Sequence, residues 1–178
     1  TSGISVIAKH AVSASFLHYA RSHSLIQKKY IALLDGCIAR DSDIHTTKTF
    51  MKRMQDSVII RCIGEENDPD SFEAITHWRV LFSNDAVSLV EAIPETGRTH
   101  QLRVHFAHLG HPIIGDDIYG TANEIIPRHA LHAYSLSLPL PYGDKIATFV
   151  SMPPEDMQNA FNLLSGKELC TLINEEKD

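Results

Sequence analysis

Residues 95–120 read ETGRTHQLRVHFAHLGHPIIGDDIYG and hold two arginines, four histidines and four glycines. Three apolar residues in this stretch recur at spacings of four and three: Leu102, Phe106 and Leu109. This period predicts an amphipathic helix over residues 99–109. Thr99 is a residue type that caps helix N-termini, and Gly110 is of the type that ends helices. Residues 111–119 predict a loop, because they combine proline, glycine and two consecutive aspartates.

Strand-like segments flank this helix in both directions along the chain. Residues 72–82 alternate in polarity and lead through a turn into residues 87–93, which predicts an antiparallel hairpin. The polar residues 37–56 predict only short edge strands or a loop. Strands are also expected at residues 3–8, 30–34, 58–63, 132–138 and 146–150, and helices at residues 11–23 and 155–165. Because few helices separate the strands, we predict an α+β fold with a mainly antiparallel, mixed central sheet and flanking helices.

The composition is that of a folded protein of ordinary domain size. Of the 178 residues, 43% are hydrophobic and 21% are charged, which excludes disorder caused by low hydrophobicity. We expect a single domain over residues 1–178, with a C-terminal helix and an acidic tail over residues 155–178. No apolar run reaches the roughly 18–20 residues of a membrane span. The three scattered cysteines favour neither a zinc site nor disulfides, and therefore favour a reducing, cytoplasmic location.

The formal net charge is -6, and much of it lies near the C-terminus. Residues 121–178 hold four basic and eight acidic residues. This balance argues against indiscriminate binding of polyanions, but it leaves room for a local basic groove.

Arginine and histidine are the residues of the central stretch that most suggest chemistry. Arg98 falls near the start of the predicted helix, where its charge opposes the helix dipole, so we expect an anionic partner for it. His105 and His108 are three residues apart on the helix and could share one metal ion. The spacing indicates no third ligand, so we predict no metal site.

Several segments together resemble the signature of the RluA/RluD-type RNA pseudouridine synthases. These are GRTHQLRVH at residues 97–105, LGHPI at residues 109–113 and GDDIYG at residues 115–120. KKYIALLDG at residues 28–36 is similar to the family's K-x-Y-x-A strand, and LHA at residues 131–133 to its late L-H-A strand. The resemblance runs from Thr1 to about Pro154. It implies the pseudouridine synthase α+β fold, with the active cleft across the middle of its sheet.

The resemblance also implies a reaction. Such enzymes break the glycosidic bond of a uridine that is flipped out of the RNA, turn the base and rejoin it through C5. They need no metal, nucleotide or redox cofactor. Their nucleophilic aspartate lies in a motif R-L-D-x-x-T-S-G, and this sequence begins Thr1-Ser2-Gly3. We therefore expect the aspartate three residues before Thr1, and we expect the chain as given to be catalytically incomplete.

The resemblance assigns roles to seven residues. Arg103 would keep the aspartate ionised, although it also fits a surface arginine on a helix. Tyr30 would stack on the uracil and help to remove the C5 proton, although it also fits a core tyrosine. Leu131 would be an apolar wall against the base. The remaining four would contact phosphates or brace the active-site strand: Lys28, Arg98, His100 and His105.

Other residues of the motif fit structural roles. Thr99 and Gln101 are candidates for positioning the loop before the helix. Asp116 and Asp117 could belong to a structured loop behind the pocket, but turn formation and helix capping are the preferred interpretation.

Two other functions stay open at the level of sequence. A non-catalytic RNA-binding module could retain the same fold, and the residue three positions before Thr1 distinguishes it from an enzyme. A histidine-rich metal hydrolase is a more remote hypothesis, which elemental analysis would test. The partner expected for the first two is RNA, ribosomal or transfer, and a monomer is favoured.

Overall fold

A computed structural model describes residues 1–141 and 145–175 of the protein. The last three residues of the predicted acidic tail, 176–178, lie outside the described residues. None of the helices in the described ranges is both long and apolar enough to cross a membrane.

The described chain forms one large, mostly antiparallel sheet. Its strand order is β1-β7-β2-β6-β5-β3-β4, and β8 pairs with β7 outside this path. Among the strand pairs of the described residues, only the pairing of β1 with β7 is parallel. The strands are β1 (Ser2–Gly3), β2 (Gln27–Asp35), β3 (His45–Arg53), β4 (Arg61–Gly64), β5 (Phe72–Ser83), β6 (Val87–Pro94), β7 (Leu131–Pro139) and β8 (Ile146–Val150).

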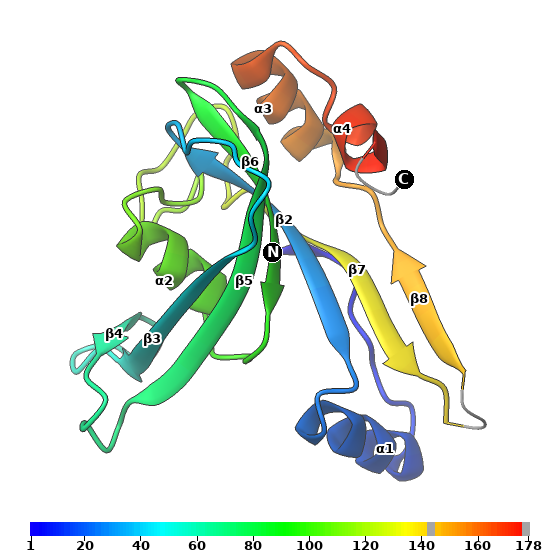
Figure 1. Ribbon diagram of the computed structural model, residues 1–178. Helices are drawn as coiled ribbons and strands as arrows, with labels where there is room; N and C mark the ends of the chain where they lie inside the picture. The colour runs from blue at the N-terminus through cyan, green and yellow to red at the C-terminus, as the bar shows by residue number, and fades with distance from the viewer. Residues whose placement is uncertain (142–144, 176–178) are drawn as a thin grey trace.

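Within residues 1–141 and 145–175, four helices border the sheet: α1 (Ala11–Ser22), α2 (Gln101–His108), α3 (Glu155–Ser165) and α4 (Leu169–Glu175). Helix α2 packs against β3 to β6, whereas α3 packs on β6 and α4 on β5. Figure 1 shows α1 at the opposite end of the molecule from α3 and α4. The mainly antiparallel α+β fold predicted from the sequence is confirmed.

The hydrophobic core lies at the middle of the sheet, where the apolar strands pair side by side. Residues 31–34 of β2 are all buried, as expected for an unbroken apolar run. In β5 the buried Ala74, Thr76 and Trp78 alternate with half-buried residues, which is the period of a strand with one face on the core. Phe106 of α2 meets Trp78 edge to face, with ring centroids 5.9 Å apart. The central helix is therefore fixed to the sheet through aromatic packing.

The structure differs from the sequence-based expectations at several elements. The prediction of short edge strands or a loop over residues 37–56 was wrong, because β3 is a nine-residue strand between β5 and β4. Its polar Thr47 is buried and accepts a hydrogen bond from the Trp78 indole at 2.9 Å. The strand predicted over residues 3–8 is only two residues long, and α4 was not predicted.

Candidate active site

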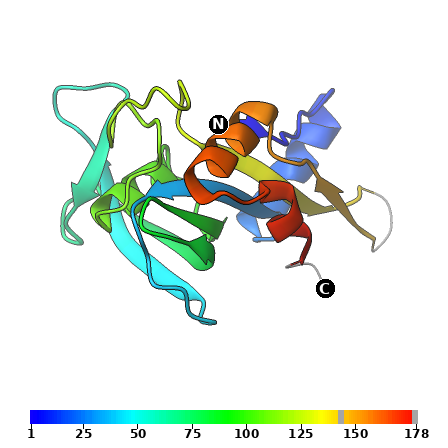
Figure 2. The same ribbon diagram turned by 90° about the horizontal axis from the view of Figure 1, so that it is seen from above.

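A cavity of about 450 Å³ opens where five segments of the chain meet. These segments are the N-terminal residues 1–5, the start of β2, the loop before α2, the first turns of α2 and the start of β7. In Figure 2 the N-terminus lies near the middle of the view, and residues 2–3, which follow it, pair with the start of β7. Six of the seven residues assigned from the sequence line the cavity: Lys28, Tyr30, Arg98, His100, Arg103 and Leu131.

Tyr30 lies on β2, the strand between β7 and β6. It is opposite Ala92 on one side and Ala133 on the other, and the β2–β7 register shifts between Lys29 and Tyr30. Such an irregularity re-aims a side chain relative to a regular strand. Burial raises the pKa of the Tyr30 phenol, so the side chain is a neutral hydroxyl at pH 7. Tyr30 can therefore offer an aromatic face and a hydroxyl to the cavity.

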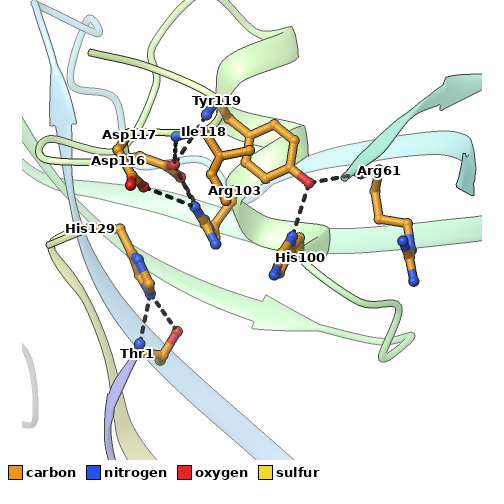
Figure 3. A network of polar contacts seen from close by, with 9 residues as sticks. All are labelled: Thr1, Arg61, His100, Arg103, Asp116, Asp117, Ile118, Tyr119 and His129. Carbon is orange, nitrogen blue, oxygen red and sulfur yellow. Dashed lines mark hydrogen bonds and ion pairs between the residues drawn. The ribbon is translucent and has the colours of Figure 1, made fainter. Parts of the chain in front are cut away.

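Arg103 is buried and forms a bidentate ion pair with Asp116 (Figure 3). Its Nε donates to Oδ2 at 2.7 Å and its Nη2 to Oδ1 at 2.6 Å. The Asp116 carboxylate is fully buried, and its Oδ1 also accepts the backbone N–H groups of Ile118 and Tyr119. Burial alone would raise the pKa of Asp116, but the bonds from Arg103 and the two N–H groups outweigh it, so the net shift is downward. Asp116 is therefore ionised.

This pairing gives Asp116 two tasks at once. It caps the turn at residues 118–119, as its turn-forming residue type predicted, and it also neutralises part of the Arg103 charge. Two of the three guanidinium nitrogens of Arg103 are occupied by Asp116, and within the described residues Nη1 has no hydrogen-bond partner. One donor nitrogen thus remains for an anion at the cavity.

His100 and Tyr119 form the other side of the same network (Figure 3). The Tyr119 hydroxyl accepts the backbone N–H of Arg61 at 2.8 Å and lies 2.9 Å from His100 Nδ1. The Tyr119 ring also faces the Arg103 guanidinium, whose central carbon is 5.0 Å from the ring centroid. Burial, followed by the Arg103 charge, lowers the pKa of His100. The imidazole is therefore neutral at pH 7 and available for hydrogen bonding.

The N-terminus of α2 is built differently from the sequence-based expectation. His100, not Thr99, is the N-cap residue, and it has a left-handed backbone with φ of 58° and no side-chain cap. The predicted Thr99 cap was therefore wrong. Gln101 holds the preceding loop instead, because its Oε1 accepts from Thr96 Oγ1 and the Arg98 N–H. Its Nε2 donates to the Ile75 carbonyl on β5.

His105 is the one assigned residue that does not line the cavity. It is 1% exposed, and its Nε2 lies 3.0 Å from Thr49 Oγ1 on β3. Burial, with a smaller contribution from His108, lowers the pKa of His105 to about 4. A neutral, buried imidazole cannot reach a phosphate, so its contact fits the bracing of β3 against α2.

The comparisons with known proteins agree with this geometry. Residues 1–108 match the family description "RNA pseudouridylate synthase". The chain belongs to this family. It is 38% identical over 157 residues to the "uncharacterized RNA pseudouridine synthase YjbO" of Bacillus subtilis, covering 88% of this chain and 53% of that protein.

Other members of the family extend the likeness. The chain is 33% identical over 168 residues to the "ribosomal large subunit pseudouridine synthase D" of Nitrosomonas europaea, covering 88% of this chain and 46% of that protein. The solved structure of human RNA pseudouridylate synthase domain containing 1 superposes with a TM-score of 0.69 at 26% identity, over 96% of this chain and 73% of that one. The chain thus spans about half the length of the curated relatives that it matches.

The N-terminal segment joins this family site through glycine and histidine contacts that the sequence alone did not reveal. A side chain at Gly3, where φ is +104°, would bring its Cβ into collision with the Ala133 carbonyl oxygen. His132 Nε2 donates to the Ser151 carbonyl at 2.8 Å, so Nδ1 of the neutral ring accepts the Ser2 hydroxyl at 2.9 Å. In the sequence, the signal for these contacts is that TSG at residues 1–3 and LHA at residues 131–133 both match motifs of the family.

Metal ligands do not gather in the described part of the chain. No group of three or more histidine, cysteine, aspartate or glutamate residues within residues 1–141 and 145–175 has the arrangement to hold an ion. The cavity is lined instead by two guanidinium groups, a phenol, two imidazoles and apolar side chains, among other groups. Such a lining suits a flat, neutral base beside an anion.

Proposed function

We propose that the full-length protein isomerises a specific uridine in ribosomal or transfer RNA to pseudouridine. The observation that carries the proposal is the single cavity that brings Tyr30, Arg103 and Leu131 together from three separate elements. Leu131 is 4% exposed and supplies an apolar wall, while Tyr30 supplies an aromatic face. A flipped uracil, which needs stacking and a closed pocket, matches these surfaces.

The nucleophile in this proposal is the aspartate that the family motif places three residues before Thr1. Thr1 lines the cavity, and three residues of extended chain span at most about 11 Å. The aspartate is therefore within reach of the same space. The unoccupied Nη1 of Arg103 would stabilise its ionised form, which a closed pocket otherwise disfavours.

The steps that follow use the groups on the cavity wall. The carboxylate attacks either the sugar or the base, which breaks the bond between C1′ and N1. The detached uracil turns between Tyr30 and Leu131, and a bond then forms between C1′ and C5, with release of the carboxylate from its bond to the substrate. The proton on C5 must leave, and the neutral Tyr30 hydroxyl passes it to water or to a neighbouring group. N1, freed from C1′, gains one proton from water for the proton that leaves C5, so the product is an isomer of the substrate and no co-reactant is needed.

The charge distribution near the cavity supports an RNA substrate. Residues 1–34 contain no Asp or Glu but four basic residues: Lys9, Arg21, Lys28 and Lys29. Lys28 lines the cavity, and α1 lies in the same acid-free segment. Basic side chains attract the phosphate backbone without selecting a sequence. The acidity of the chain as a whole is thus compatible with a basic face at the site.

Release of tritium from RNA labelled at C5 of uridine tests the proposal, with the full-length protein as the enzyme. Isomerisation must expel the C5 hydrogen, so we expect release in proportion to pseudouridine formed. RNA that is bound without any release of tritium would overturn the proposal and favour the non-catalytic RNA-binding module.

A further inference from the structure

A second cavity of about 730 Å³ adjoins the first on the side of the β3–β4 hairpin. Arg98 lines both cavities, so the two are contiguous. We call the second cavity the hairpin groove, after the residues that define it: Lys52, Arg53, Arg61, Asp68, Phe72 and Arg98. It contains none of the groups to which the proposed reaction assigns a chemical step.

The hairpin groove has more positive charge than the nearby carboxylates neutralise. Lys52 pairs with Asp68 at 2.6 Å. Arg61, by contrast, donates from Nη1 to three backbone carbonyls, at residues 58, 59 and 60. Carbonyl oxygens orient a guanidinium without cancelling its charge.

The other two arginines of the groove, Arg53 and Arg98, likewise keep a positive charge that no paired carboxylate neutralises. Arg98 Nε donates to the Glu73 carbonyl at 2.9 Å. Neither Arg98 nor Arg53 has an ion pair among the described residues. Asp70 also lines the groove, but three unpaired guanidinium groups outweigh one carboxylate. The groove is therefore suited to an anionic ligand.

Phe72 adds an aromatic surface to this basic groove. Its side chain is 57% exposed at the start of β5, although a phenylalanine is ordinarily buried. The Arg98 guanidinium carbon lies 5.5 Å from the Phe72 ring centroid, which holds the cation beside the ring. An exposed ring among cations is the arrangement on which nucleobases stack while their phosphates are contacted by arginine.

The groove is also joined to the first cavity through hydrogen bonds. The backbone N–H of Arg61 donates to the Tyr119 hydroxyl, which contacts His100 at the cavity wall (Figure 3). The position of β4 is thus tied to the position of the candidate active site. A polymer that leaves the first cavity past Arg98 enters the hairpin groove directly.

We propose that the hairpin groove binds the single-stranded RNA segment next to the target uridine. Phe72 stacks on one of its bases, and Arg53, Arg61 and Arg98 contact its phosphates. This inference rests on the proposed function, because the first cavity defines where the target uridine sits. A duplex would use the arginines but not Phe72, since its bases are already stacked.

Fluorescence anisotropy tests the stacking contact. The probe is a fluorescein-labelled oligouridylate of about 12 nucleotides, and the protein is full-length. Phe72→Ala should weaken binding about tenfold, because one base–aromatic stack is lost. Phe149→Ala is the matched control, since Phe149 is 51% exposed on β8, a strand that pairs with β7, toward the other end of the sheet from β3 and β4. Equal affinities for the two variants would overturn the proposal.

Salt dependence tests the phosphate contacts. Arg53→Gln should reduce the slope of log K against log salt concentration by about 0.7, the value for one phosphate on a single strand. Lys145→Gln, an exposed cation at the other end of the sheet, should leave the slope unchanged. A changed slope for Arg53→Gln together with an unaffected Phe72→Ala variant would show phosphate contacts without base stacking, and would overturn the single-strand assignment.

Tritium release from the same proteins separates this inference from the proposed function. If the wild type releases no tritium while Phe72→Ala still weakens binding, the function fails and the groove stands. If the wild type releases tritium and no groove variant changes binding, the groove fails and the function stands.

Discussion

Arg103 and Asp116 form the most buried ion pair among the described residues, with 8% and 0% of their side chains exposed. Removal of one partner from such a pair leaves an uncompensated charge in the protein interior, which solvates it much less well than water does. Asp116→Asn keeps the size and one oxygen acceptor but removes the charge that balances Arg103. We expect the free energy of unfolding to fall by about 3–5 kcal/mol, measured by urea denaturation.

The matched control for this substitution is Asp117→Asn. Asp117 is 75% exposed and lies 3.9 Å from the same guanidinium, so its loss should change stability by less than about 1 kcal/mol. Equal effects of the two substitutions would contradict a specific contribution from the buried pair.

At Tyr30, removal of one oxygen atom separates stacking on the uracil from proton transfer. Tyr30→Phe keeps the ring that would stack on uracil and removes only the hydroxyl. In the full-length protein we expect RNA binding within about twofold of the wild type and a fall in turnover of about 10²-fold or more, as for loss of a general acid–base group. Tritium release and anisotropy measure the two quantities.

Tyr19→Phe provides the comparison for that experiment. Tyr19 is 54% exposed on α1 and does not line the cavity, so its hydroxyl should be dispensable for turnover. Wild-type turnover in Tyr30→Phe would remove Tyr30 from the groups that move a proton.

At the level of elements, the short parallel pairing of β1 with β7 positions the N-terminal segment. It depends on Gly3, whose φ of +104° is unfavourable for other residues and whose Cβ position is filled by the Ala133 carbonyl. Gly3→Ala should therefore displace residues 1–5 from β7 and destabilise the protein by about 2 kcal/mol or more. Turnover should fall as well, because these residues line the cavity.

Gly97→Ala distinguishes this backbone effect from the general cost of replacing a glycine. No atom lies within 4 Å of the Cβ position at Gly97, so we expect unchanged stability by urea denaturation. If Gly3→Ala unfolds at the same urea concentration as Gly97→Ala, the close packing of β1 on β7 is not required for the fold.

Strand β3 shows how an element can depend on its neighbours. Its sequence HTTKTFMKR carries no apolar alternation, yet it pairs with both β5 and β4. The buried faces of Thr47 and Met51, the Trp78 indole and the His105 imidazole supply its partners. A polar strand is stable here because its Thr47 and Thr49 hydroxyls find hydrogen-bond partners in the Trp78 indole and the His105 imidazole, although Nδ1 of His105 is buried without a partner among the described residues.

For the whole molecule, buried histidines predict a stability that falls in acid. Burial lowers the pKa of His105 to about 4 and also lowers the pKa values of His100 and His132. The unfolded chain, with histidine pKa near 6.5, binds these protons first. The contribution of these histidines to the free energy of unfolding is therefore fully present above about pH 6.5 and is lost as the pH falls toward 4.

The contribution of His105 alone is up to about 3 kcal/mol, since one pKa unit corresponds to about 1.4 kcal/mol. His105→Gln should flatten the fall of unfolding free energy between pH 6.5 and 4 by up to this amount. His18→Gln, an exposed site on α1, should leave the curve unchanged. If the curves of unfolding free energy against pH run parallel for the wild type, His105→Gln and His18→Gln, then His105 is not protonated on unfolding in this range.

The sequence by itself determined the elements whose signal is local. The apolar run of β2, the alternation in β5 and the helical period of α2 each depend on neighbours within a few residues. The motifs that resemble the family also named six residues that line one cavity. Such motifs are informative because the same backbone placement brings the same side chains together.

Only the tertiary structure decided the contacts that join distant segments. It paired Arg103 with Asp116, removed His105 from the cavity, placed His100 at the N-cap and made β3 an inner strand. It also set Phe72 beside Arg98 in the hairpin groove. Hydrogen bonds, burial and packing between segments far apart in the chain produce these features, and no local pattern of residues encodes them.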